Sequence, residues 1–76
     1  MSSSWLGLRL SRAGVPPHQY KECMEWAFGK GWESILCSQM NEVWNKTHPD
    51  LTQLKSSDSV VYVFKVIGKA FLERKV

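Results

Sequence analysis

The chain has 76 residues, of which 43% are hydrophobic, and a formal net charge of +3. This length allows one domain with a thin core, and this hydrophobic content argues against a disordered chain. The longest unbroken apolar run is only 60–64, and no continuous apolar stretch follows a basic start, so we expect neither a membrane-spanning helix nor a signal peptide. We therefore expect a single domain over 1–76, located in the cytoplasm, with reduced cysteines and no membrane contact.

The first element, 4–13, fits two structures. Leu6, Leu8 and Leu10 alternate with other residues, as they would on one face of a strand. Gly14, in contrast, is suited to ending a short helix. Both alternatives stay open for this segment.

The segment 18–28 predicts a helix that follows Pro16 and Pro17, because a proline at a helix start needs no N–H partner. The turn 29–31, with two glycines, ends it. Trp26 lies away from the centre of the apolar face, which contains Tyr20, Cys23, Met24, Ala27 and Phe28.

A third helix is predicted over 32–46. It ends before Pro49, because the residue that precedes a proline avoids helical geometry, and 50–55 is a connection. The predicted apolar face of this helix consists of Trp32, Leu36, Met40, Val43 and Trp44.

The last helix is predicted over 58–74, where the apolar side chains fall within an arc of about 120°, the width of a core-facing stripe. Ser56, Ser57 and Asp58 are the candidate N-caps. A strand at 60–67 is the alternative, because this run is rich in β-branched and aromatic residues. We expect an all-α fold, a compact three- or four-helix domain with short loops, and keep an α+β fold with that strand as the alternative.

No catalytic or metal-binding pattern emerges. His18, Glu22 and Glu25 share one face of a predicted helix and could in principle hold a metal or act in acid–base chemistry. We expect a solvated helix face instead, because acidic residues near a helix N-terminus are favourable without forming a site. Zinc fingers and knuckles hold the metal with two close pairs of ligands, and the cysteines and histidines, separated by four, thirteen and ten residues, do not supply two such pairs. We therefore expect no enzyme activity, no metal and no cofactor.

Charge is concentrated at the two ends of the chain. Residues 1–21 and 59–76 each have a net charge of +3, and the middle, 22–58, has −3. If the two ends lie close together, their cations form one basic surface for an acidic protein, DNA or RNA; the alternative is ordinary solubilising charge. The candidate anion- or nucleic-acid-binding residues are Arg9, Arg12, Lys65, Lys69, Arg74 and Lys75.

A DNA-binding motif is a further possibility for nucleic-acid binding. The helices predicted at 18–28 and 32–46, joined by the glycine turn, have the order of a helix-turn-helix. Glu33 and Glu42, however, lie on the second helix and no arginine does, which weakens this hypothesis.

Aromatic residues outnumber what three short helices need in their core. Exposed tryptophans are typical of binding hot spots, although aromatics are often only partly buried at core edges. The predicted protein-binding residues are Trp5, Trp26, Arg9 and Arg12. We expect a non-enzymatic interaction module, such as a regulator, inhibitor or accessory subunit, that docks a protein partner through exposed aromatic and basic residues. A small nucleic-acid-binding protein that uses its basic N- and C-terminal segments is the alternative, and homo-oligomerisation stays open.

Overall fold

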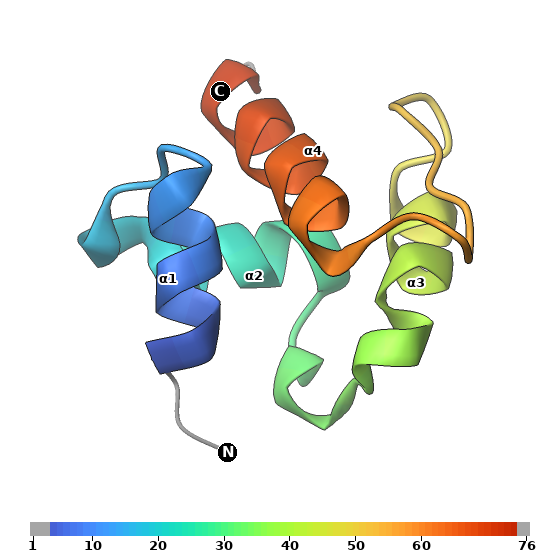
Figure 1. Ribbon diagram of the computed structural model, residues 1–76, viewed down its shortest axis with the longest axis horizontal. Coiled ribbons are helices and arrows are strands. Elements are labelled where there is room, and N and C mark those ends of the chain that lie inside the picture. The colour runs from blue at the N-terminus through green and yellow to red at the C-terminus, as the bar shows by residue number, and fades with distance from the viewer. Residues whose placement is uncertain (1–3, 75–76) are drawn as a thin grey trace.

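The structure is a computed structural model that describes residues 4–74, with side chains from Leu6 onward. The part described contains four α-helices and no strand (Figure 1), which confirms the all-α fold and rules out the alternative strand at 60–67. Three short 3₁₀ turns, at Pro17–Gln19, Trp32–Ser34 and Cys37–Gln39, connect the helices. The helices are α1 (Ser4–Arg12), α2 (Tyr20–Phe28), α3 (Met40–Thr47) and α4 (Val60–Glu73).

The ambiguous first segment is helix α1. Leu10 is completely buried whereas Leu8 is 48% exposed, so the alternating leucines do not share one face. The helix ends in a Schellman motif, in which the Val15 N–H donates to the Leu10 carbonyl at 3.0 Å and the Gly14 N–H donates to the Ser11 carbonyl at 3.0 Å. Gly14 has the positive φ of 94° that this motif requires.

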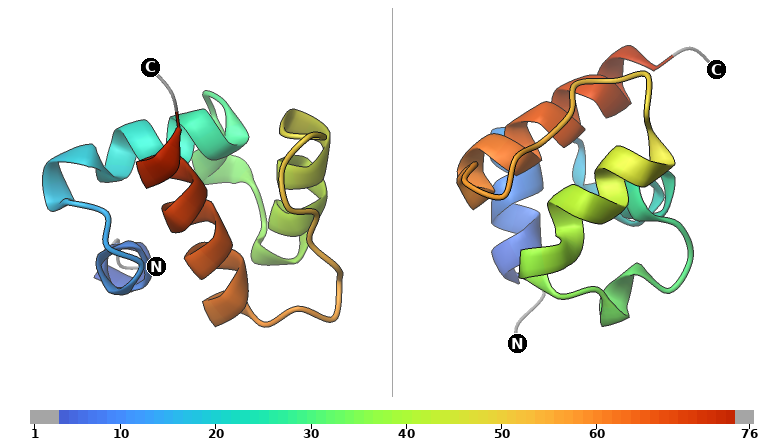
Figure 2. Two further views of the ribbon diagram at one scale, coloured as in Figure 1. Left: turned by 90° about the horizontal axis from the view of Figure 1, so that it is seen from above. Right: turned by 90° about the vertical axis from the view of Figure 1, so that its right-hand side faces the viewer.

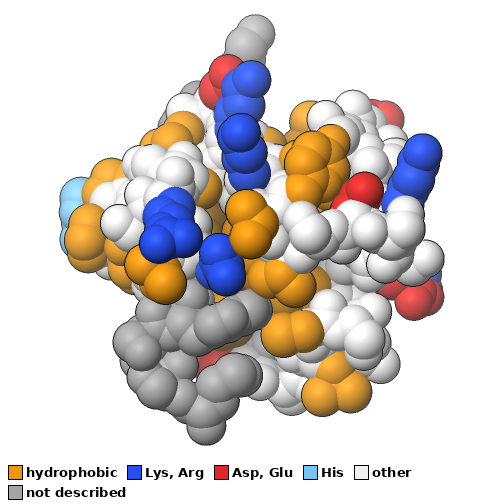
Figure 3. Space-filling model, in the orientation of Figure 1, with side chains coloured by type: hydrophobic (Ala, Val, Ile, Leu, Met, Phe, Trp, Pro, Cys, Tyr) orange, Lys and Arg blue, Asp and Glu red, His pale blue; other side chains and the backbone are white. Residues whose placement is uncertain are grey.

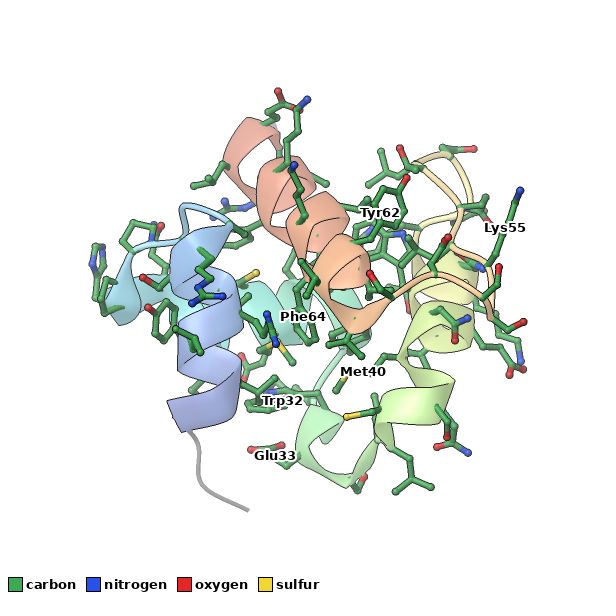
Figure 4. All side chains as sticks on the ribbon, in the orientation of Figure 1. Trp32, Glu33, Met40, Lys55, Tyr62 and Phe64 are labelled. Carbon is green, nitrogen blue, oxygen red and sulfur yellow. The ribbon has the colours of Figure 1, made fainter. Side chains whose placement is uncertain are left out.

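The prediction of a helix over 32–46 is wrong for the first half of this segment. The chain forms two 3₁₀ turns, separated by the extended residues Ile35 and Leu36, before α3 begins at Met40. Leu36, predicted on the apolar face, is 63% exposed, and Ile35 packs against the core instead. The break lets Trp32 lie toward α1 (Figure 4) while α3 packs on α2, which a straight helix could not achieve. The helix-turn-helix hypothesis is therefore wrong as well.

The connection 48–59 is fixed to α3 by side-chain hydrogen bonds. The indole N–H of Trp44 donates to the Thr52 carbonyl at 2.8 Å. The Asn45 side chain donates to the Leu54 carbonyl and accepts from the Leu54 N–H, both at 2.7 Å. These bonds hold the connection beside α3, so its backbone has a defined path without regular structure.

Helix α4 is at the centre of the packing and contacts both α1 and α2 (Figure 2). Its N-cap is Ser59, whose hydroxyl accepts from the Tyr62 N–H at 3.2 Å, and not one of the three residues predicted before it. Gly68 faces α1 so closely that a Cβ there would overlap the Cβ of Ala13. The two helices nearest the chain ends therefore lie side by side. The buried face of α4 consists of Val63, Phe64, Ile67, Gly68 and Phe71.

Candidate functional site

An open groove of about 810 Å³ lies between α4 and the connection that follows α3. Leu51 and Thr52 form the wall on the side of the connection, and Trp26 of α2 contributes to the lining between the two walls. Figure 4 shows Tyr62 projecting from α4 toward the connection. The α4 wall consists of Tyr62, Lys65, Val66, Lys69, Ala70, Glu73 and Arg74.

Trp26 is half-buried and belongs to an aromatic cluster. Its ring meets those of Trp44 and Phe71 edge to face, with centroids 5.6 and 5.8 Å apart, and lies 4.4 Å from the ring of His48. His48 Nε2 also donates to the Trp26 carbonyl oxygen at 2.9 Å. Edge-to-face aromatic contacts fix the position of the Trp26 ring, and the bond from His48 fixes the backbone that carries it, so this part of the groove is formed before any ligand arrives.

The wall formed by the connection after α3 is also held in place. Leu51 is 40% exposed and presents an apolar side chain to the groove. The Gln53 amide donates to the carbonyls of both His48 and Leu51 at 3.0 Å, which closes the turn that carries Leu51. Together with the bond from Trp44 to Thr52, this gives the groove a rigid second side.

The groove has a cationic rim. Lys65 and Lys69 are exposed and have no ion-pair partner within residues 4–74. Glu73, four residues after Lys69 and also exposed, forms no ion pair with it there. Arg74 differs, because its guanidinium bonds Glu22 of α2 and the Phe71 carbonyl, both at 2.6 Å, and lies 3.7 Å above the Phe71 ring. Lys65 and Lys69 therefore provide the free positive charge at the groove.

The structure brings together half of the binding residues predicted from sequence. Trp26, Lys65, Lys69 and Arg74 all line the groove, although they were assigned to two different activities. Sequence reasoning missed Tyr62 and Leu51. Tyr62 carried a signal, because it continues a second stripe on α4 at helical spacing (Tyr62, Val66, Lys69 and Glu73).

The other predicted residues lie elsewhere. Arg9 and Arg12 belong to α1, and Lys and Arg side chains gather over α1 and α4 in Figure 3. Arg12 is exposed, whereas Arg9 is partly buried and its Nε has no hydrogen-bond partner among the described residues. The side chain of Trp5, and Lys75 as a whole, lie outside the part described.

The remaining reactive side chains do not converge. Cys23 is completely buried, and burial raises the pKa of its thiol to about 12. Cys37 is exposed, and both thiols are free. Residues 4–74 contain no group of three His, Cys, Asp or Glu side chains placed to hold a metal ion.

Within the same residues, no helix combines the length and the apolar character needed to cross a membrane. Comparisons with protein-family models, with curated proteins and with solved structures find no match to this chain.

Proposed function

We propose that the chain is a non-enzymatic helical module that docks a protein partner, and that the groove on α4 is its docking surface. The observation that carries this proposal is that Trp26, Tyr62 and Leu51 line one groove, whose rim holds Lys65 and Lys69 without an ion-pair partner within residues 4–74. Aromatic side chains in preformed depressions supply most of the energy in typical interfaces, and rim charges select and steer the partner.

The chemistry of the groove defines the kind of partner segment. Tyr62 is 44% exposed and, with Leu51, offers apolar area to an inserted side chain. The two lysines, four residues apart on α4, favour carboxylates that flank the inserted side chain. The groove therefore suits a short acidic segment with one aliphatic or aromatic anchor.

Selection from a random peptide library displayed on phage tests this proposal. We expect enriched peptides with acidic residues around an apolar anchor, and about tenfold weaker binding for Tyr62→Ala and for Lys65→Glu combined with Lys69→Glu. Lys55→Glu is the matched control, because Lys55 is an exposed lysine that points away from the groove (Figure 4). Trp26 is a poor test residue, because its removal would also damage the aromatic cluster.

Two outcomes would contradict the groove proposal. One is a selection that enriches no common acidic and apolar pattern. The other is a set of peptides that bind the groove variants as tightly as the unaltered chain. A third outcome is that a second copy of the chain occupies the groove. Light scattering detects it, because the molar mass of the free protein would then be that of a dimer.

Nucleic-acid binding is the second candidate, and the packing of α1 on α4 favours it. This packing places Arg9 and Arg12 on the helix next to the one that carries Lys65 and Lys69. Phosphate contacts by these cations would give an affinity that falls steeply as salt rises. Fluorescence anisotropy with duplex and single-stranded probes decides this, and no binding at about 50 mM salt removes the candidate. Tyr62→Ala distinguishes the two functions, because it should weaken peptide binding and leave phosphate contacts intact.

A further inference from the structure

The contact between α1 and α4 is bordered by exposed side chains. Gly68 of α4 meets Ala13 at the end of α1, where a Cβ on Gly68 would overlap that of Ala13. Lys65 lies three residues before Gly68 and Leu72 four residues after it, so both border the contact on α4. The side chain of Leu72 reaches Gly14, where a Cβ would lie 3.3 Å from its Cδ1. We call the exposed side chains of the two helices on this side the α1–α4 face, and they are Leu8, Arg12, Val61, Lys65, Lys69 and Leu72.

This face has an excess of positive charge. The charged residues of α1 are Arg9 and Arg12. Those of α4 are Lys65, Lys69 and Glu73. The cations of the face form no ion pair within residues 4–74. Figure 3 shows Lys and Arg side chains over α1 and α4 with hydrophobic side chains between them. The face therefore attracts a partner whose negative charge is spread over an area.

Aliphatic side chains stand among these cations. Val61 is 54% exposed, Leu8 48% and Leu72 46%. Leu and Val are under-represented among the hot spots of protein interfaces. The phosphates of nucleic acids gain nothing from aliphatic groups, because they are bound by hydrogen-bond donors and cations. The boundary between lipid headgroups and acyl chains, in contrast, takes up aliphatic side chains while anionic headgroups attract Lys and Arg.

We propose that the α1–α4 face binds the surface of a membrane that contains anionic lipids. Leu8, Val61 and Leu72 enter the boundary between headgroups and acyl chains, and the cations contact the lipid phosphates. Such a contact needs neither a spanning helix nor a signal peptide, the two features whose lack led to the expectation of no membrane contact. It goes beyond the docking of a protein partner, because only Lys65 and Lys69 of this face also line the groove on α4.

Co-sedimentation with vesicles tests the proposal on the unaltered chain. One set of vesicles consists of phosphatidylcholine alone, and the other contains about 30% phosphatidylserine. At about 100 mM salt we expect at least about tenfold tighter binding to the anionic vesicles, because each Lys or Arg near such a surface adds about fivefold. A higher salt concentration should reduce this difference, because it screens the exposed charges.

Two variants remove the apolar and the cationic contacts separately. Val61→Ser combined with Leu72→Ser should weaken binding to the anionic vesicles by about tenfold. Leu36→Ser is the matched control, because Leu36 is also an exposed leucine and belongs to neither helix. Arg12→Glu should weaken vesicle binding by about tenfold and leave peptide binding unchanged, since Arg12 does not line the groove. Circular dichroism checks that each variant keeps the fold.

The unaltered chain alone can overturn the proposal, through equal binding to the two kinds of vesicle or binding to neither. Undiminished vesicle binding by the variant with Val61→Ser and Leu72→Ser would also overturn it, because the aliphatic side chains would then not enter the lipid. Binding to duplex DNA at the same salt without binding to anionic vesicles would assign the face to nucleic acid instead. None of these results bears on the groove, which the peptide selection tests separately.

Discussion

The two connections that flank α3 are of similar length but are held in place by different forces. In 48–59, side chains of α3 bond the backbone of the connection across eight or nine residues of sequence. In 29–39, the side-chain hydrogen bonds to the backbone are local, as from the Ser34 hydroxyl to the Gly31 carbonyl at 2.8 Å, and Trp32 and Ile35 pack against the core. The connection with long-range polar bonds forms a rigid groove wall, and in the connection without them the indole N–H of Trp32 has no hydrogen-bond partner among the described residues.

The largest expected effect comes from making the same substitution at the two tryptophans. Trp44→Phe removes a buried ring and its bond to Thr52, and we expect it to lower the free energy of unfolding by about 3 kcal/mol. Trp32→Phe removes an N–H that has no hydrogen-bond partner within residues 4–74, and we expect a loss of about 1 kcal/mol or less. Urea denaturation followed by circular dichroism measures both, and equal losses would contradict the contrast between the connections.

A second pair of substitutions compares polar bonds alone. Asn45→Ala removes both bonds to Leu54 and should lower the free energy of unfolding by about 2 kcal/mol. Ser34→Ala removes one exposed, local bond and should change it by about 0.5 kcal/mol or less. Thermal unfolding of the two variants gives the comparison, and a large loss in Ser34→Ala would mean that 29–39 also depends on its polar bonds.

The buried thiol of Cys23 in α2 predicts a loss of stability at alkaline pH. Because burial raises the pKa of Cys23 from 9.0 to about 12, its contribution is complete below about pH 9 and is lost as the pH rises toward 12. Within this window we expect a loss of about 1 kcal/mol per pH unit relative to Cys23→Ala. If the free energy of unfolding changes with pH in the same way for the unaltered chain and for Cys23→Ala between pH 9 and 11, the raised pKa of Cys23 is contradicted.

The smallest effect concerns the thiol in 29–39. Cys37 is exposed, so Cys37→Ser should leave stability within about 0.5 kcal/mol. Labelling of the native chain with a thiol reagent at neutral pH should modify Cys37 rapidly and Cys23 only when the core opens. Rapid labelling of the Cys37→Ser variant would show that the core is more open than its packing indicates.

Sequence patterns anticipated the parts of this fold that depend on one helix at a time. The apolar stripe of 58–74 and the proline start before α2 both gave helices close to the observed ones. The prediction over 32–46 was wrong in its first half because Trp32, Leu36 and Met40 keep helical spacing across a break in which Leu36 turns outward. Such a break is decided by where Trp32 packs against another helix, which spacing alone does not reveal.

The residues of the candidate sites show the same difference between what single helices predict and what tertiary contacts decide. Trp26 and the lysines of α4 were found from their positions on single helices. Leu51 and Thr52 were not, because the bond from Trp44 to Thr52 that places them depends on the tertiary structure. The N–H of Trp32, which has no acceptor in the part of the chain that the structure describes, was also beyond sequence reasoning, since hydrogen-bond partners depend on the tertiary structure.

The contact between Gly68 and Ala13 has a practical consequence. Since there is no room at this contact even for a methyl group, any larger residue at 68 requires α4 and the end of α1 to move apart. Position 68 therefore makes the spacing of these two helices a quantity that a single substitution can vary.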